Sequence, residues 1–343
     1  MKTLSVIIPT YNRAEYCRKL LGILKESGVP DLEVIVVDDG STDDTERVVR
    51  ETDPRAKYIR QKNSGPATAR NTGFKHSTGD YVSFLDCDDE WMPGKPAEAL
   101  AYLNDYPEVD ALFTDAAVGN PVDGYKSLLQ GQKPFFDVLC KEPESHFRIL
   151  DPVPFFRWML HRNAIFLGSM IIRREVFESS GQFDPELCGA ADWNLCLRLA
   201  NCQKFGFWDE QMAVYTKHEG GMSNDADGMS AEFCLALKKL RTQAYLEGYE
   251  KKLVERHLQH HLFGYAYKAY DRGDFATART RFMDLMKTTG FEIRGFAYYA
   301  LSSLPSGLAR VIRRMKQIAF GTVDLTPKLP QPEVRTRAVL KKT

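Results

Sequence analysis

The chain has 343 residues, of which 43% are hydrophobic and 27% charged, a composition that suits one large α/β domain with an additional segment. Its formal net charge of +0 provides no bulk field to attract nucleic acid or a strongly acidic partner. Seven cysteines without a CxxC pair argue against a disulfide framework or a zinc site. No apolar run approaches the roughly 20 residues of a membrane span, and the segment MKTLSVIIPTYN is too short in its apolar part for a signal peptide. We therefore expect a cytoplasmic protein that at most lies against the inner face of a membrane.

The first part of the chain alternates short apolar runs with segments of helical periodicity. The apolar runs predict four strands, at 4–8, 32–40, 56–61 and 81–86, with a helix in each interval between them. Runs that are apolar on both faces and alternate with helices are typical of a parallel sheet covered on both sides. The pattern predicts a Rossmann-like β-α-β-α-β-α-β half, but without the GxGxxG motif of a dinucleotide site after its first strand.

The rest of the chain is less regular and then becomes helical. Within 94–226 we expect helices at 95–106 and 190–202, strands at 111–115, 169–172 and within 205–223, and a long loop with a short helix over 120–154. Beyond residue 227 we expect one long helix over 229–270, half of a helix-turn-helix pair near 272–290, a basic amphipathic helix over 294–320, and a disordered tail from 321 to 343.

Polar residues gather where the predicted parallel strands end, which is where open α/β sheets bind ligands. The most acidic of these segments is LDCDDEW, which places Asp86, Asp88 and Asp89 directly after an apolar strand. Like charges at this spacing repel one another unless a positive group lies among them. Mg²⁺ and Mn²⁺ prefer oxygen ligands and commonly bind one or two protein carboxylates together with substrate phosphates. The cluster therefore indicates a divalent cation that holds a diphosphate, with a solvated acidic turn as the alternative.

Seven motifs occur in an order that resembles the family 2 glycosyltransferases of the GT-A fold. They are VIIPTYNR, VIVVDDGSTDDT, NSGPATARNTG, GDYVSFLDCDDEW, IRREVFESSGQFDPEL, ADWNLCLRLA and HEGGMS. The resemblance covers roughly residues 2–224. It implies an α/β fold: a Rossmann-like GT-A domain over 1–226 with a mixed central sheet, in which 1–93 bind the nucleotide sugar and 94–226 form the acceptor and catalytic part. An α-helical region over 227–320 would follow.

The resemblance also implies a role for individual residues at the nucleotide. Tyr11 would line the base pocket, Asp39 would hydrogen-bond a uracil imide, and Arg70 would hold its segment against the nucleotide. Arg70 could instead only pair with a carboxylate. The nucleotide site that the resemblance implies consists of Pro9, Thr10, Tyr11, Asp38, Asp39, Gly65, Arg70, Asp86, Cys87 and Asp88. Of these, Cys87 would point into the core, because neighbouring side chains of an extended chain point to opposite sides.

The same resemblance implies the catalytic and metal-binding groups. Asp192 would be the general base, and Asp88 and His218 would hold Mn²⁺ or Mg²⁺. The family usually has Glu-Asp where this chain has Ala191-Asp192, so the base is present while its acidic neighbour is missing. Taken alone, Asp192 could be a helix cap and His218 a solvated loop histidine. A metal that neutralises the leaving diphosphate and one base that activates a hydroxyl suffice for a single displacement with inversion.

The sequence thus predicts a metal-dependent inverting hexosyl- or N-acetylhexosaminyltransferase that uses a UDP-sugar. Its acceptor would be a hydroxyl of a glycan or of a lipid-linked saccharide, in surface polysaccharide synthesis. Two alternatives stay open: an inactive nucleotide-sugar-binding module, and a nucleotidyltransferase, which should carry a Gly-rich basic loop where this chain has PTYNRAEY. The C-terminal helices would cover the acceptor site, form a homodimer or contact the membrane.

Overall fold

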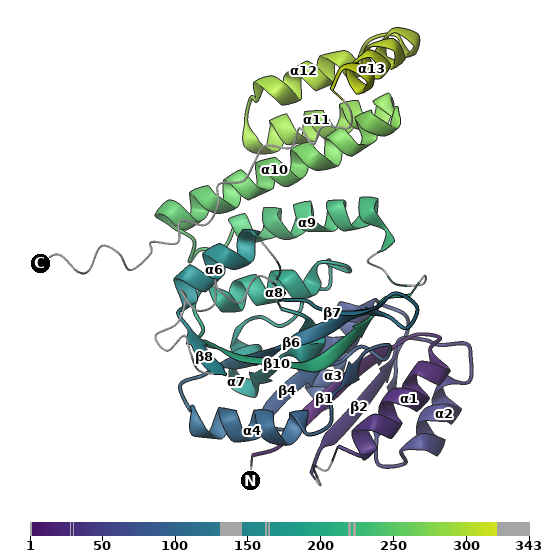
Figure 1. Cartoon of the computed structure of the whole chain (residues 1–343), viewed down its shortest axis with the longest axis vertical. Helices are drawn as coiled ribbons and strands as arrows, with labels where there is room; N and C mark the ends of the chain where they lie inside the picture. Colours follow the sequence, from purple (N-terminus) through teal and green to yellow (C-terminus); the bar gives the residue numbers. More distant parts are fainter. Residues whose placement is uncertain are drawn as a thin grey trace, which may run out of the picture. The chain divides into compact units, whose positions relative to one another are not determined.

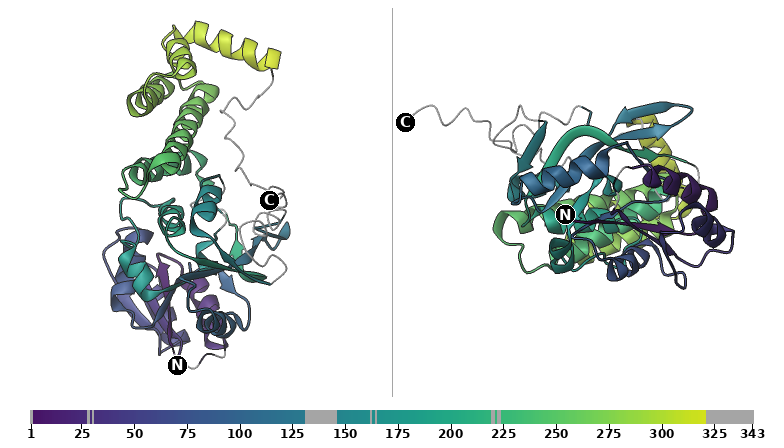
Figure 2. Two further views of the ribbon diagram at one scale, coloured as in Figure 1. Left: turned by 90° about the vertical axis from the view of Figure 1, so that its left-hand side faces the viewer. Right: turned by 90° about the horizontal axis from the view of Figure 1, so that it is seen from below.

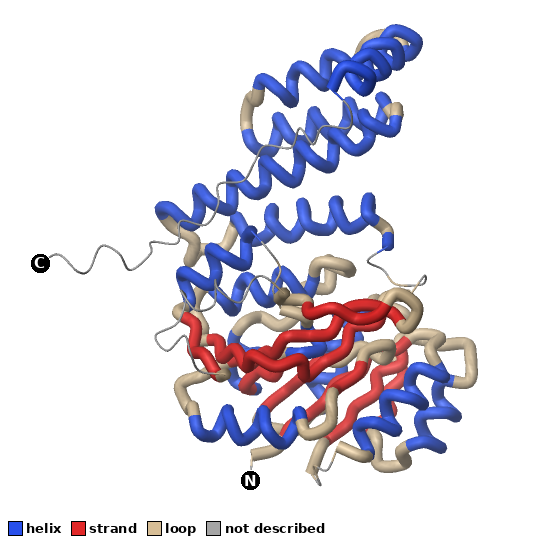
Figure 3. The backbone as a smooth tube through the Cα atoms, viewed as in Figure 1, coloured by secondary structure: helices blue, strands red, loops and turns tan. Residues whose placement is uncertain are grey.

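The computed structural model describes residues 2–27, 29, 31–130, 146–161, 163, 165–218, 221 and 224–320, the last five by their backbone only. The described residues through Gly221 form one compact unit, and those from 224 onward form a second. Figures 1 and 3 show that the first unit is built around a sheet and that the second consists of helices. The predicted tail at 321–343 lies outside the described residues.

Four parallel strands at one end of the sheet confirm the predicted Rossmann-like half. In spatial order they are β3 (Lys57–Arg60), β2 (Glu33–Asp38), β1 (Leu4–Thr10) and β4 (Tyr81–Phe84). Every residue of β1 is buried, as the continuous apolar run predicts for a strand covered on both faces. The connecting helices are α1 (Ala14–Lys25), α2 (Thr45–Thr52) and α3 (Pro66–His76).

The helices divide between the two faces of these strands. Leu20 and Leu24 of α1 belong to the same core cluster as Leu4 and Val6 of β1. On the opposite face α3 approaches so closely that a Cβ added at Gly73 would lie 2.3 Å from Ile7 Cγ2 and 3.1 Å from Val37 Cγ2. Glycine at this position therefore lets the helix backbone rest directly on the sheet.

The sheet then changes direction and becomes mixed, as predicted for the fold class. β9 (Ile171–Arg173) runs antiparallel to both β4 and β6 (Ala111–Asn120), between which it lies. β6 is parallel to β10 (Phe205–Thr216). β5 (Glu90–Trp91) and β8 (Phe147–Leu150) both pair with β10 in the antiparallel direction. The remaining elements of this unit are α4 (Lys95–Asp105), α6 (Pro152–His161), the 3-10 helix η1 (Leu167–Ser169), α7 (Arg174–Ser179) and α8 (Ala191–Ala200).

The long loop predicted over 120–154 is wrong at both of its ends. β6 continues to Asn120 and forms a hairpin with β7 (Gly124–Ser127), while β8 and α6 occupy the residues after 146. A Cβ at Gly119 would lie 2.0 Å from the carbonyl oxygen of Gly124, so the hairpin needs a glycine at this position. In a sequence, however, glycine usually weakens a strand prediction, which is why the pattern indicated a loop here. Residues 131–145 of the predicted loop lie outside the described part of the chain.

The second unit contains helices α9 (Ala226–Arg241), α10 (Gly248–Arg272), α11 (Phe275–Thr289), α12 (Ile293–Ser302) and α13 (Ser306–Phe320) (Figures 1 and 2). The prediction of one helix over 229–270 is wrong, because α9 ends at Arg241 and residues 242–247 are not helical. Gly248, where α10 begins, has φ +51°, a conformation that a right-handed helix does not continue through. The prediction of one helix over 294–320 is also wrong. Pro305 lies between α12 and α13, and its missing N–H and fixed ring suit a helix start rather than an interior. In the part of the chain that is described, no helix combines the length and apolar character needed to cross a bilayer.

Candidate active site

The carboxyl ends of β1, β2 and β4 meet at one edge of the sheet. Thr10, the last residue of β1, pairs in register with Asp38, the last residue of β2. The amide of Leu85, just beyond β4, donates to the carbonyl of Ile7, which keeps the following segment beside β1. The predicted polar segments are therefore neighbours in space, as the direction of parallel strands requires.

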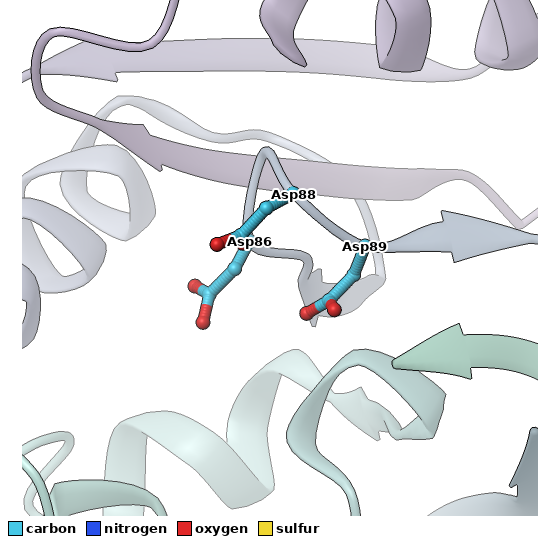
Figure 4. Close-up of side chains that lie close together, drawn as sticks. All are labelled: Asp86, Asp88 and Asp89. Carbon is cyan, nitrogen blue, oxygen red and sulfur yellow. The ribbon is translucent and has the colours of Figure 1, made fainter. Parts of the chain in front are cut away.

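Three carboxylates follow β4 on a single turn, which a hydrogen bond from the amide of Asp89 to the carbonyl of Asp86 closes at 3.1 Å. Figure 4 shows Asp86 and Asp89 pointing in the same direction, with Asp88 beside Asp86. One oxygen from each of the three lies within 4.8 Å of the others. This is the spacing at which several oxygens can share one cation, so the residues present fit a Mg²⁺ or Mn²⁺ ion.

Asp89 is the carboxylate that the proposed ligand set did not include. It is 3% exposed, and its Oδ1 has no hydrogen-bond partner in the structure. Burial, and then the charges of Asp86 and Asp88, raise the pKa of Asp89 well above its usual value. A buried carboxylate oxygen without a donor is costly unless a cation compensates it. The only sign of this residue in the sequence is that a further aspartate follows Asp88 directly in LDCDDEW.

His218 reaches the same cluster from the segment after β10. Its Nε2 lies 2.7 Å from Oδ2 of Asp88, and its ring stands 5.6 Å from the ring of Tyr16. The two residues proposed as metal ligands are thus brought together from positions 130 residues apart in sequence. Their role as ligands stays a prediction.

Arg70 projects from α3 toward the acidic cluster. The guanidinium, in a side chain that is nearly fully buried, donates to Oδ1 of Asp86 at 2.6 Å and stands 5.4 Å from the ring centre of Phe183. Arg70 therefore pairs with a carboxylate, and its role in holding its segment against the nucleotide stays a prediction. A buried cation beside Asp86 also offsets part of the charge that the cluster concentrates.

Asp192, the proposed base, lies in the first turn of α8, and the charges of Arg70 and Asp86 influence its pKa. Ala190 rather than Asp192 is the N-cap residue, and the backbone N–H of Trp193 donates to Oδ1 of Asp192 at 2.7 Å. The carboxyl group keeps some contact with solvent but is densely surrounded by protein, and this burial raises its pKa. Among the smaller influences, the charge of Arg70 lowers the pKa of Asp192 and that of Asp86 raises it. A raised pKa makes the carboxylate a stronger proton acceptor, as suits a general base.

Asp39 ties the end of β2 to the segment before α3. Its carboxylate accepts hydrogen bonds from the side-chain amide of Gln61 at 2.7 Å and from the backbone N–H groups of Ser64 and Gly65, each at 2.8 Å. Gly65 has φ +85°, a conformation that favours glycine. The contact of Asp39 with a base stays a prediction, and the structure adds that this residue organises the loop on which Gly65 lies.

Asp38 is fully buried and its oxygens are already used within the protein. Oδ1 accepts from the backbone N–H of Ser41 at 2.7 Å, and Oδ2 accepts from the hydroxyl of Tyr58. Burial and this hydrogen bond raise the pKa of Tyr58. These contacts favour a positioning role for Asp38 at the strand end, and its contact with a nucleotide stays a prediction.

The remaining predicted residues divide between the core and the surface of this edge. The Tyr11 side chain is 48% exposed and free to contact a base, whereas Pro9 is buried within β1. Cys87 is buried as expected, with its sulfur 3.7 Å from Oγ1 of Thr10. Thr10 is buried as well, and its contact with the nucleotide stays a prediction.

Lys95 is a residue of this region that pattern reasoning missed. It is fully buried, and its side-chain nitrogen donates to the carbonyl of Gly168 at 3.0 Å. The indole N–H of Trp91 donates to the same carbonyl at 2.6 Å, and the Lys95 nitrogen stands 4.6 Å from the Trp91 ring centre. These bonds connect the segment after the acidic turn to η1. A lysine at the start of an amphipathic helix normally indicates a solvated position, so the sequence carried no signal for its burial.

Comparison with known proteins decides the family. The model of glycosyl transferase family 2 matches residues 5–179, which contain the residues described above at the ends of β1, β2 and β4, while Asp192 and His218 lie beyond the match. The chain belongs to this family. A family 2 glycosyltransferase is also what the ordered motifs predicted, and the GT-A fold, with C-terminal helices after its mixed sheet, is confirmed.

Relatives of this glycosyltransferase match it over different lengths. Glycosyltransferase GlyA of Streptococcus pneumoniae is 38% identical over 120 residues, which are 34% of this chain and 16% of GlyA. The uncharacterized glycosyltransferase RT0329 of Rickettsia typhi is 25% identical over 255 residues, 74% of this chain and 73% of that protein. GalNAc(5)-diNAcBac-PP-undecaprenol beta-1,3-glucosyltransferase of Campylobacter jejuni is 38% identical over 110 residues, 31% of this chain and 36% of that enzyme. The chain thus spans a small part of GlyA and about three quarters of RT0329.

Solved structures show the same fold at low identity. Residues 1–349 of TarS from S. aureus superpose with a TM-score of 0.63 at 18% identity, covering 96% of this chain and 99% of that one. The same part of TarS has been solved with UDP-GlcNAc. The mannosyltransferase PcManGT of Pyrobaculum calidifontis, solved with GDP-Man and Mn²⁺, has a TM-score of 0.53 at 20% identity and covers 92% of this chain and 86% of its own.

Proposed function

We propose that the protein transfers a hexosyl or N-acetylhexosaminyl group from a UDP-sugar to a hydroxyl of a glycan or lipid-linked saccharide, with inversion, in surface polysaccharide synthesis. One observation carries the proposal: three carboxylates, one of them with the unpartnered oxygen of Asp89, cluster on the turn after β4, and the charge of Asp86 in this cluster acts on the pKa of Asp192. The cluster supplies a place for a metal-bound diphosphate and Asp192 a base, which are the two groups that the reaction needs.

Different residues would bind the metal ion, the base and the nucleoside of the donor. Asp88, His218 and Asp89 would hold Mn²⁺ or Mg²⁺, which when bound supplies Lewis-acid neutralisation of the departing diphosphate. Tyr11 would stack on the base, and Asp39 and Gly65 would position the loop against the nucleoside. A UDP-sugar donor is supported by the likeness to TarS, which binds UDP-GlcNAc, and GDP-Man in PcManGT is the competing precedent.

Asp192 would act on the acceptor. Its carboxylate takes the proton of the acceptor hydroxyl as that oxygen forms a bond to the anomeric carbon and the bond to the diphosphate breaks. One displacement reverses the configuration at that carbon. Arg70, held against Asp86, keeps a positive charge near both the leaving group and the base. The missing acidic neighbour leaves the base itself in place, but the buried Ala191 cannot make the donor or acceptor contact that an acidic residue would make there.

A lipid-linked acceptor is supported by one relative, the C. jejuni enzyme named for an undecaprenol-linked glycan. The test is a transfer assay with UDP-sugars and GDP-sugars against a soluble glycan and a polyprenyl-diphosphate saccharide. NMR of the product reads the anomeric configuration. We expect transfer from a UDP-sugar with inversion. Retention of configuration, or binding of donors without any transfer, would reject the proposed reaction, and the second result would favour the inactive-module alternative.

A further inference from the structure

The last two helices of the second unit carry apolar side chains on their solvent side. On α12 the exposed positions are Ile293, Phe296, Ala297 and Ala300, and on α13 they are Leu308, Val311 and Met315, with Ile312 half-buried. Both sets follow the spacing i, i+3, i+4, i+7, which places them on one face of a helix. Ile293 is 76% exposed and Met315 64%, values that are unusual for large apolar side chains arranged in a stripe.

The opposite side of α13 is the one that packs on protein. Ala309 is fully buried, and the guanidinium of Arg313, one turn further, donates to the carbonyl of Asp271 at the end of α10. These contacts fix the rotation of α13 about its axis. They leave the stripe of Leu308, Val311 and Met315 turned toward solvent.

Basic residues border the apolar stripes. Arg294, Arg310 and Arg314 are exposed, and the segment 293–320 contains five basic residues and no acidic one. Glu292, which precedes α12 as its N-cap residue, accepts hydrogen bonds from the amides of Arg294 and Gly295. Each of the two helices therefore presents a stripe that is apolar at its centre and positive at its border, and we call the two stripes together the C-terminal face.

We propose that the C-terminal face docks on the surface of a membrane that contains anionic lipids. A helix of this kind lies in the interface with its apolar stripe in the headgroup region and its arginines on anionic headgroups. The helices cannot span the bilayer, since α12 has 10 residues and α13 has 15, against the roughly 20 that a span requires. This inference goes beyond the proposed reaction and does not depend on it.

Charge complementarity distinguishes this occupant from the alternatives. Two copies of the chain that paired through the C-terminal face would bring arginines against arginines. The segment 321–343 is also a poor match, because its five basic and two acidic residues give it the same sign as the face. An anionic bilayer supplies both the apolar layer and the opposite charge.

The experiment is flotation of the full-length protein with vesicles of phosphatidylcholine alone and of phosphatidylcholine with phosphatidylglycerol. The wild type is expected to float with the anionic vesicles and to be released from them by salt. Arg310→Gln with Arg314→Gln should lower the partition coefficient roughly tenfold or more, because each basic residue near such a surface adds about 1 kcal/mol. Val311→Ser with Met315→Ser should lower it at any salt concentration.

The control variants replace the same types of exposed side chain in the first unit. Arg18→Gln with Arg47→Gln removes two exposed arginines from the first unit, and Val122→Ser changes a valine that is 92% exposed there. Both should float like the wild type. All substituted side chains are exposed, and the melting temperature verifies folding. If the apolar variant does not fold, the charge variant decides.

Three results would overturn the proposal. One is no flotation of the wild type with anionic vesicles. Another is equal flotation of the wild type and the Arg310→Gln, Arg314→Gln variant. The third is a dimer in light scattering that Val311→Ser with Met315→Ser dissociates, which would assign the C-terminal face to a second copy of the chain.

Discussion

Asp192 shows how the chain sets the chemistry of one residue through its surroundings. Burial raises the pKa of its carboxyl group, and the nearby Arg70 charge counteracts this effect. The carboxylate of Asp86 links the two, because it accepts a hydrogen bond from Arg70 and acts on Asp192 through its charge. The acidic turn and the proposed base are thus coupled at the level of single side chains.

Replacing the proposed base should separate chemistry from donor binding. Asp192→Asn keeps the size of the side chain but cannot accept the acceptor proton, so kcat should fall roughly 10²- to 10⁴-fold. The affinity for the donor, measured by the rise in melting temperature with nucleotide sugar, should stay near the wild-type value. Full transfer activity in this variant would show that another group is the base.

The pH dependence of kcat should report the influence of Arg70. A base must be deprotonated, so the rate falls as the pH drops through the raised pKa of Asp192. Arg70→Met removes the charge that lowers this pKa and should move the acid limb of the profile to higher pH, whereas Arg70→Lys should leave the limb near its wild-type position. A loss of rate that is the same at every pH would mean that Arg70 has a structural role only.

Lys95 gives a stability prediction of definite sign. Burial lowers its pKa well below the usual value, so the folded protein binds fewer protons here than the unfolded chain. Stability should therefore rise as the pH increases from neutral toward the ordinary lysine pKa of about 10.4. Lys95→Met should lose this rise, and the exposed control Lys75→Met should keep it. The melting temperature measured against pH is the test, and an unchanged rise in Lys95→Met would contradict the assignment.

At the scale of elements, the contact between α3 and the sheet positions the segment that carries Arg70. Gly73 lies where the helix backbone meets Ile7 and Val37, and Gly65, the N-cap residue before the helix, has a positive φ of +85°. Both glycines are therefore needed for the path of the chain from the nucleotide loop to the acidic cluster. A helix held at a larger distance would also hold Arg70 away from Asp86.

Two glycine-to-alanine substitutions test this contact as a matched pair. Gly73→Ala should destabilise the protein by about 1–3 kcal/mol, because the added methyl group has no space in a well-packed core. Gly22→Ala, within α1, meets no atom within 4 Å and should stabilise the protein by roughly 0.5–1 kcal/mol through helix propensity. Thermal or urea unfolding measures both, and equal effects of the two substitutions would refute the close approach of α3.

At the scale of the whole molecule, the sequence predicted the elements that follow from a local hydrophobic pattern. The buried strands β1, β2 and β4 follow from continuous apolar runs, and the direction of parallel strands then brings Asp38 and Asp86 to one edge. The position of β9 between β4 and β6 has no local signal, because strand pairing depends on contacts far apart in sequence.

The misses at this scale have the same origin. The periodicity from 229 to 270 is helical throughout, whereas the folded chain leaves the helix after Arg241 and begins a second one at Gly248. In the site, the residue types of the LDCDDEW turn indicated a cation, but the burial of Asp89 and Lys95 depends on how the turn packs against other elements. Such packing is a property of the folded chain, which composition and spacing do not contain.

The most direct test of the central claim is metal-dependent donor binding. The melting temperature of the full chain would be measured with UDP-, dTDP-, GDP- and CMP-sugars, each with Mn²⁺ and with a chelator, because a ligand that binds only the folded state raises it. The account predicts a rise with UDP-sugars that needs Mn²⁺ and that Asp88→Ala abolishes. A rise that persists with the chelator, or no rise with any nucleotide sugar, would contradict the assignment of the acidic turn as the metal and donor site.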